Sequence, residues 1–392
     1  SIDPVTIGEF VTYAIAPVHV DGVVVPVRNL LSIDISPDTR QIIDQGAGSA
    51  ITFTAIGTFD AAPLTEDIST TVTWNSNPSD VMSFASNVGT GFGMGTTVIT
   101  ATLGAVTSAD SCQVIVKPAV NLNIPGIQFG YSIDANQTTG EVYVAFQQSP
   151  MRVAVYNDQG VWQREWTVST SDIASGGIRP VTVDETTGNV AVSAYSALVG
   201  FNTVVFDSAG TRLIGYHRDF GCSQNAFEYL DNGQLWGADF CSGPMSATRY
   251  NPATGATIGG FNNGFLAASY GMENYNNLLY VSTPGGRNSG AAFTVIDPAA
   301  SSVVVTGGST FTNASQNTDI TVDRDGYIHL SWTTTVNQHV IKTYEYTAPS
   351  TVTELYQWQA GADFDTEGLG CVRSSNVIVA FHGFPWALTF MQ

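Results

Sequence analysis

Four acidic residues in the C-terminal two-thirds of the chain could act together as cation ligands. They are Glu228, Glu273, Asp319 and Glu367, and each lies near the first strand of a separate repeat, with Arg179 near an earlier one. Carboxylate oxygens around a narrow opening suit a hard cation such as Ca²⁺. The number of residues between each acid and the turn that follows it differs, so the four carboxylates need not lie at the same depth in this opening. We therefore expect no metal or cofactor, only acids that are solvated or accept hydrogen bonds from loop amides; a Ca²⁺ site is the alternative.

The sequence offers no recognisable catalytic residues. The chain has no Gly-x-Ser-x-Gly elbow, no His-Glu-x-x-His motif and no phosphate-binding loop. The five histidines are scattered along it: His19, His217, His329, His339 and His382. We therefore expect that the protein is not an enzyme.

The cysteine spacing predicts one disulfide. Cys222 and Cys241 flank the turn at 231–233 almost symmetrically, so they lie close to opposite each other on a hairpin, near bridging distance. The alternative is a pair of buried free thiols. Cys112 and Cys371 fall in separate apolar strands and are expected to be unpaired core residues. Neither the Cys nor the His spacing suggests zinc.

Aromatic residues suggest a second, binding function. They could stack on sugars if several were exposed on one face, although their alternation with polar residues favours packing between sheets. These residues are Trp162, Trp166, Tyr195, Tyr216, Trp332, Trp358 and Trp386.

A recurring turn shows which elements must position these residues. From residue 129 onward, an apolar run repeatedly ends in Asp or Asn, polar residues and Gly follow, and a second apolar run begins, as in Asp134 to Gly140 before Glu141. A period of 40 to 50 residues made of short strands predicts radially repeated sheets, a β-propeller. The turn residues are Gly140, Gly188, Gly233, Asn277, Gly326 and Asn376.

A further turn inside each repeat completes a four-stranded meander. Examples are Asn157 to Gly160 and Asp207 to Gly210, in which Asp or Asn comes first and Gly last. The last repeat lacks its outer strand, and residues 119–124, ahead of the first repeat, can supply it. This closure removes an open sheet edge and gives six blades over residues 119–392.

Residues 119–392 resemble the six-bladed propeller families, namely the NHL-repeat, gluconolactonase-like and streptogramin-lyase-like groups. The resemblance rests on the Asp-x-x-x-Gly-x-Val/Leu-Tyr/Trp rhythm and the Asp/Asn-Pro-x-x-Gly turns, as at Asn251 to Gly255. It implies, as an alternative function, a secreted lyase or lactonase with a cation at the channel mouth. The catalytic residues of those families find no matching positions here.

In residues 30–118, apolar and polar residues alternate strictly along five or more short strands. This pattern predicts a β-sandwich with Trp74 as its large core aromatic. The ordered motifs Ser36-Pro37, Thr54-Ala55-x-Gly57, Thr73-Trp74-x-Ser76-x-Pro78 and Gly95-x-Thr97-x-Ile99-x-Ala101 resemble the bacterial Ig-like group 2 module. That module occurs in intimin-type adhesins and phage virion proteins.

Residues 1–29 fit neither module. They are extended and apolar, so we expect an arm that pairs with other virion or surface proteins in an oligomer or larger assembly, or else an extra strand on the sandwich. No Lys/Arg-headed signal segment is visible, and no stretch approaches the roughly 20 apolar residues of a membrane span.

Composition limits the partners. Acidic residues outnumber basic ones 33 to 13, giving a net charge of −20, while charged residues make up only 12% of the chain. Such a surface repels nucleic acid and anionic membranes. We expect an all-β virion-surface or extracellular protein, structural or adhesive, most simply a phage virion component used in host attachment. A bacterial adhesin or a carbohydrate-binding protein, with cell-surface glycan as partner, is the alternative.

Overall fold

The computed structural model divides the chain into two compact units, Ser1–Lys117 and Pro118–Gln392, which are described separately. The structure describes residues 28–125, 130–147, 150–171, 173, 178–194, 203–216, 223–240, 245–266, 271–282, 292–307, 316–333, 339–347, 351–358, 366–382 and 387–392. The predicted arm therefore lies outside the described residues, except for its last two. Of these, Arg28 pairs with Glu66, and Asn29 binds Asp60 within the same unit.

The first unit consists of three sheets. A three-stranded sheet has the order β1-β4-β5; a larger one runs β10-β9-β11-β2, with β6 also paired to β9; and a third runs β3-β8-β7. Their bounds are β1 (Leu30–Ser36), β2 (Gln41–Ile43), β3 (Ile51–Thr52), β4 (Thr54–Phe59), β5 (Thr65–Asp67), β6 (Thr73–Asn77), β7 (Met82–Ala85), β8 (Val88–Gly91), β9 (Gly95–Leu103), β10 (Val106–Thr107) and β11 (Cys112–Val116), with one 3-10 turn η1 (Ala47–Ser49).

The core of this unit forms where the alternating strands place their apolar residues on one face. In β9 every second residue is buried, as the period of a half-buried strand requires. Trp74 lies in this core as predicted: its ring packs against Phe53 and Phe84, and its indole N–H donates to the Ser69 carbonyl at 2.9 Å.

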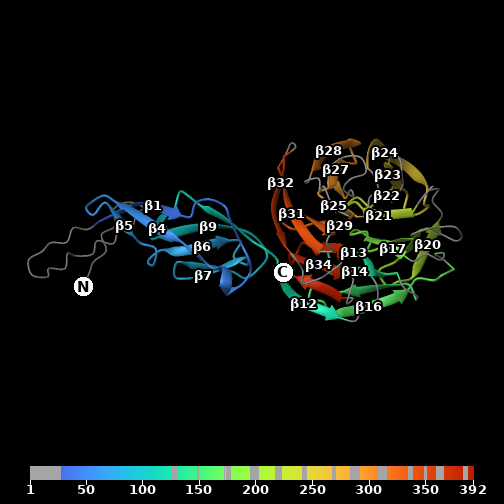
Figure 1. Cartoon of the computed structure of the whole chain (residues 1–392), viewed down its shortest axis with the longest axis horizontal. Coiled ribbons are helices and arrows are strands. Elements are labelled where there is room, and N and C mark those ends of the chain that lie inside the picture. The colour runs from blue at the N-terminus through green and yellow to red at the C-terminus, as the bar shows by residue number, and fades with distance from the viewer. Residues whose placement is uncertain are drawn as a thin grey trace, which may run out of the picture. The chain divides into compact units, whose positions relative to one another are not determined.

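The second unit repeats a four-stranded antiparallel sheet. In Figure 1 these sheets surround a common centre. The innermost strand is the first of each set of four given below, except in the last set, where it is the fourth. The sheets are β13 (Gly130–Asn136), β14 (Glu141–Phe146), β15 (Arg152–Tyr156), β16 (Trp162–Thr167); β17 (Ile178–Val183), β18 (Val190–Ala194), β19 (Thr203–Phe206), β20 (Arg212–Tyr216); β21 (Ser223–Tyr229), β22 (Leu235–Phe240), β23 (Met245–Tyr250), β24 (Thr257–Leu266); β25 (Met272–Tyr275), β26 (Leu278–Ser282), β27 (Phe293–Asp297), β28 (Ser302–Gly307); β29 (Gln316–Val322), β30 (Ile328–Thr333), β31 (His339–Thr347), β32 (Thr351–Trp358); and β12 (Val120–Pro125), β35 (Ala387–Met391), β34 (Val377–His382), β33 (Thr366–Val372).

The recurring turn adopts the backbone that its residues predict. Each of the six turn residues has a positive φ, between 53° and 83°, at Gly140, Gly188, Gly233, Asn277, Gly326 and Asn376. Glycine and asparagine tolerate this left-handed conformation better than other residues. The boundary of the first turn differs from the sequence prediction: Asp134 does not open this turn, because β13 continues to Asn136.

Both ends of the unit contribute to one sheet. The strand predicted at 119–124 is β12, and it pairs antiparallel with β35, for example Asn123 with Thr389. Each innermost strand packs against those of the two adjacent sheets, and β33 packs against β13, so the series closes on itself. This arrangement is a β-propeller, and central strands such as β14, buried on both faces, are almost wholly apolar.

Two further features concern the chain as described. Cys112 and Cys371 are free and buried, which confirms their prediction as unpaired core residues. In the part of the chain that the structure describes, no helix has the length and apolar character needed to cross a membrane.

Candidate functional site

A ring of residues, one from each innermost strand, lines the centre of the propeller. Each pairs with the residue three positions after the positive-φ turn residue, as Asp134 pairs with Tyr143 and Glu228 with Trp236, so all stand at one depth. We call this set the channel ring. Its members are Asp134, Thr182, Glu228, Glu273, Thr321 and Gly370.

Hydrogen bonds join the channel ring across adjacent sheets. The Thr182 hydroxyl donates to Glu228 at 3.2 Å and accepts from the Tyr229 amide at 3.0 Å. On the other side of the ring, the Thr321 hydroxyl donates to Glu273 at 2.9 Å. These carboxylates are therefore engaged in packing one sheet against the next.

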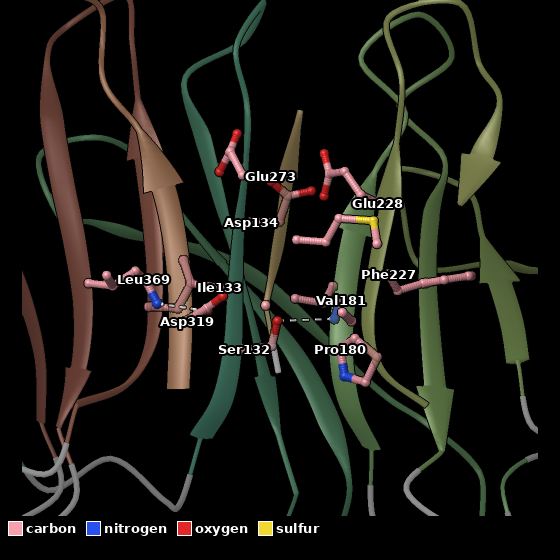
Figure 2. Close-up of a pocket in the computed structure, with 13 residues that line it drawn as sticks. Ser132, Ile133, Asp134, Pro180, Val181, Phe227, Glu228, Glu273, Asp319 and Leu369 are labelled. Carbon is pink, nitrogen blue, oxygen red and sulfur yellow. Dashed lines mark hydrogen bonds between the residues drawn. The ribbon is translucent and has the colours of Figure 1, made fainter. Parts of the chain in front are cut away.

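Two aspartates bridge adjacent sheets in the same way, but at different depths. Asp134 accepts from the Val183 amide of the next sheet at 2.7 Å, and Asp319 accepts from the Leu369 amide at 2.9 Å. Asp319 lies two residues before Thr321, so its side chain is one pleat deeper along the channel. Figure 2 shows it well away from the other three labelled carboxylates.

Three carboxylates approach one another at the upper end of Figure 2: those of Asp134, Glu228 and Glu273. The pocket that they line with Asp319 has a volume of about 10 Å³. A space of that size is close to the smallest that holds one water molecule. This pocket therefore has room for about one water molecule.

Arg373 is the cation that compensates these acids. Its guanidinium forms an ion pair with Glu273 and donates to the Asn274 carbonyl, and its Nε donates to the Val322 carbonyl at 3.1 Å. It also lies over the Tyr275 ring, 5.2 Å from the centroid. A single side chain from the β33–β34 turn thus ties together the two preceding sheets.

Burial governs the charge of the channel. Removal from water raises the pKa of Asp134 to about 6 and that of Glu273 to about 8, although Arg373 opposes both shifts. Glu185, beside the ring, has its pKa raised to about 7 by burial. Burial, reinforced by neighbouring carboxylates, also raises the pKa of Glu228 and Asp319 well above the usual range. At neutral pH the cluster therefore carries less negative charge than its composition implies.

The structure places only some of the four acids that the sequence suggested as cation ligands near one another. Glu228 and Glu273 share one depth, Asp319 lies deeper, and the side chain of Glu367 falls outside the described residues. Within the described residues, no group of three or more His, Cys, Asp or Glu is arranged to hold a metal ion. The expectation of no metal, with a Ca²⁺ site of these four acids as its alternative, stays a prediction. The Arg179 side chain also lies outside the described part.

Sequence reasoning missed Asp134, Glu185 and Arg373. The sequence pattern places Asp134 at the start of a turn, where Asp is common. Asp134 precedes Gly140 by six residues, Glu228 precedes Gly233 by five and Glu273 precedes Asn277 by four, so no constant offset from the turn identifies Asp134. These unequal offsets all lead to one depth because the turns differ in length.

A second buried network lies within sheet β29–β32. His329 is fully buried, with Nε2 3.0 Å from Asp323 Oδ2 and Nδ1 3.0 Å from Thr343 Oγ1. The Trp358 indole N–H donates to the same threonine at 3.1 Å. His329 and Trp358, the latter a candidate for sugar stacking, thus have structural roles here.

The remaining predictions fall largely outside the described residues. Cys222 and Cys241 lie there, so their disulfide stays a prediction, as does stacking by Tyr195 and Trp386; the side chains of Tyr216 and Trp332 lie there too. Trp162 is exposed, whereas Trp166 packs against the core between two sheets.

Comparison with known proteins adds little beyond the architecture. No protein-family model and no curated protein matches the chain. Among solved structures, a chain of the mitotic checkpoint complex is 12% identical, with a TM-score of 0.48, and covers 70% of this chain and 91% of its own. The WD40 repeats of RRP9 are 9% identical, with a TM-score of 0.49, and cover 70% and 98%. U3-55K is 8% identical, with a TM-score of 0.48, and covers 70% and 99%. The propeller assignment rests on the sheet topology described above.

Proposed function

We propose that this chain is a non-catalytic display protein of a virion or cell surface, most simply a phage virion component. In this proposal an Ig-like β-sandwich at residues 30–118 is joined to a six-bladed propeller at 119–392, with residues 1–29 as the attachment arm. Its surface is polar and acidic, with a net charge of −20, which suits repeated copies that must not aggregate.

The observation that carries this proposal is the use of the channel carboxylates. The oxygens of Asp134, Glu228 and Glu273 accept hydrogen bonds from adjacent sheets or pair with Arg373, around a space for about one water molecule. Groups with these partners stabilise a scaffold, whereas a catalyst needs carboxylates that face a substrate.

The test is to find the chain in its natural assembly. Particles purified through a density gradient and digested for quantitative mass spectrometry should contain it at a defined copy number per particle. A chain found only in the soluble fraction that turns over a lactone, with loss of turnover in Glu228→Gln, would contradict the proposal and favour the propeller enzyme. Glu165→Gln, an exposed acid on β16, serves as the control variant.

A further inference from the structure

An exposed apolar face lies on the rim of the propeller, where strand β16 of the first sheet approaches strand β12 of the last one (Figure 1). Three large apolar side chains form it: Leu122 is 37% exposed, and Val161 and Trp162 are each 55% exposed. We call this set the Trp162 face. Every other tryptophan side chain that the structure describes is buried or packs against a core, so an exposed indole sets this face apart.

The strand register directs Trp162 and Leu122 toward each other. Trp162 pairs with Tyr156, and Leu122 pairs with Phe390. Paired residues of antiparallel strands project to the same side of their sheet, and the Tyr156 and Phe390 rings pack edge to face across the two sheets at 6.4 Å. A side chain at Gly160 would also collide with Leu122, so the turn before Trp162 lies directly against β12. Both exposed side chains therefore border one groove between the two sheets.

The fold does not require an aromatic residue at this place. In each sheet, the third strand and the outer strand undergo a register shift near the turn end, and the outer-strand residue just past that shift occupies the position of Trp162. In the other five sheets this residue is Val120, Arg212, Thr257, Val303 or Glu354. An exposed apolar face that packing does not explain indicates a binding surface.

A hydrogen-bonding side chain lies on the same side of the first sheet. Arg152 is 25% exposed, with its guanidinium over the Phe146 ring and in an ion pair with Glu165 at 3.3 Å. Glu165 pairs in register with Ala154, two residues before Tyr156, so the guanidinium lies about 7 Å along the strand from the level of the indole. A guanidinium has five N–H groups, and one ion pair leaves donors for a ligand.

We infer that the Trp162 face binds a neutral hexose, whose ring stacks on the exposed indole. One face of a pyranose consists of C–H groups, which match a flat aromatic surface, and the hydroxyls at its edge accept from donors such as the Arg152 guanidinium. The ligand should be neutral, because Glu165 compensates Arg152 and the chain carries a net charge of −20.

The size of the face favours a small ligand over a second copy of the chain. At their exposed fractions, the three apolar side chains offer roughly 300 Å² of surface, whereas each partner in a standard protein interface buries about 800 Å². A sugar ring can be bound by one aromatic side chain and its polar neighbours.

This inference rests on the proposed display function only for its purpose, because it names a class of receptor for the displayed propeller. The two can fail separately. Hexoside binding by a chain that is absent from particles would contradict the display proposal alone, and incorporation into particles without hexoside binding would contradict this inference alone.

The experiment follows the indole N–H resonance of Trp162 in the ¹⁵N-labelled full chain, assigned by its loss in Trp162→Phe. The chain is titrated with the methyl glycosides of glucose, galactose and mannose, and at least one should shift this resonance saturably. Sugar-observed saturation-transfer NMR then compares variants. Trp162→Ala should weaken binding of that glycoside at least about tenfold, and Arg152→Gln about fivefold.

The matched control is Leu213→Ala, which removes a 52% exposed apolar side chain from the outer strand of the next sheet and should leave binding unchanged. An equal shift of the Trp162 resonance with cyclohexanol would overturn the sugar, and an equal shift with methyl glucuronide would overturn the preference for a neutral ligand. A shift that follows protein concentration without sugar would assign the face to a second copy instead. No shift with any of the three hexosides would overturn the site.

Discussion

At the scale of single residues, the positive charge of Arg373 lies beside the acidic side chains of the channel and pairs with Glu273. Replacing this arginine with Met removes the donor shared by Glu273, whose side chain is 8% exposed, and the Asn274 and Val322 carbonyls, so three buried acceptors lose a hydrogen bond. We expect Arg373→Met to lower the free energy of unfolding by about 3–5 kcal/mol in a urea titration.

The control is Arg152→Met, which breaks a pair in which Glu165 is 42% exposed and should cost no more than about 1 kcal/mol. Adding Glu273→Gln to Arg373→Met should restore part of the loss. Equal costs for the two arginines would mean that the channel acids do not need the cation.

The raised pKa values predict that stability falls as pH rises. The folded state holds protons on Asp134 and Glu273 up to pH values of about 6 and 8, whereas unfolded carboxyls release them near 3.8 and 4.5. Between these limits the folded state binds more protons, so the free energy of unfolding should decrease from about pH 5 to pH 8.

Glu228→Gln isolates one member of the cluster, since burial and neighbouring acids raise the pKa of Glu228. The amide can still accept from Thr182, but it cannot ionise. A pKa shift of one unit corresponds to about 1.4 kcal/mol. We therefore expect Glu228→Gln to raise the free energy of unfolding by at least about 1 kcal/mol at pH 8 and by less at pH 5. Thermal melts at both pH values provide the measurement, with exposed Glu165→Gln as the control; a gain independent of pH would contradict the prediction.

At the scale of elements, strand β12 determines how the last sheet is completed. A side chain at Gly160 would meet Leu122 of β12 and the Phe390 ring of β35, and φ at Gly160 is 74°. At Gly140, φ is 72°, but the nearest atom would be 3.8 Å away, on Val372. The two glycines therefore share a backbone requirement and differ in packing.

We expect Gly140→Ala to cost about 1 kcal/mol, the penalty for a left-handed alanine, and Gly160→Ala about 2–3 kcal/mol, because overpacking is added. Chemical unfolding of both variants provides the comparison. Similar costs would indicate that β12 does not pack against this turn.

The sequence predicted these elements better than it predicted the site. Short side-chain acceptors followed by Gly or Asn mark each turn, so the strands and turns can be located from the local sequence pattern. The meeting of Asp134 with Glu228, 94 positions later, depends on how far each turn advances the register, which local pattern does not encode.

At the scale of the whole molecule, the two compact units have separate cores. Phe53 is fully buried in the first unit and packs against Trp74 and Phe84. Phe53→Ala should destabilise that unit by about 3–5 kcal/mol. Scanning calorimetry should then show one transition shifted to lower temperature and a second transition, that of the propeller, unchanged; a single transition that moves as a whole would mean that the units unfold together.

The pairing of β12 with β35 also has a consequence for folding kinetics. During synthesis β12 emerges before every other strand of its unit and β35 after them, yet Ala119 and Gln392 exchange backbone hydrogen bonds at 3.3 and 3.4 Å. β12 can therefore pair with β35 only after the whole propeller has been synthesised, and closing so long a loop has a high entropic cost. Until then β12 has no partner strand, and a stalled chain presents an unpaired strand to its neighbours.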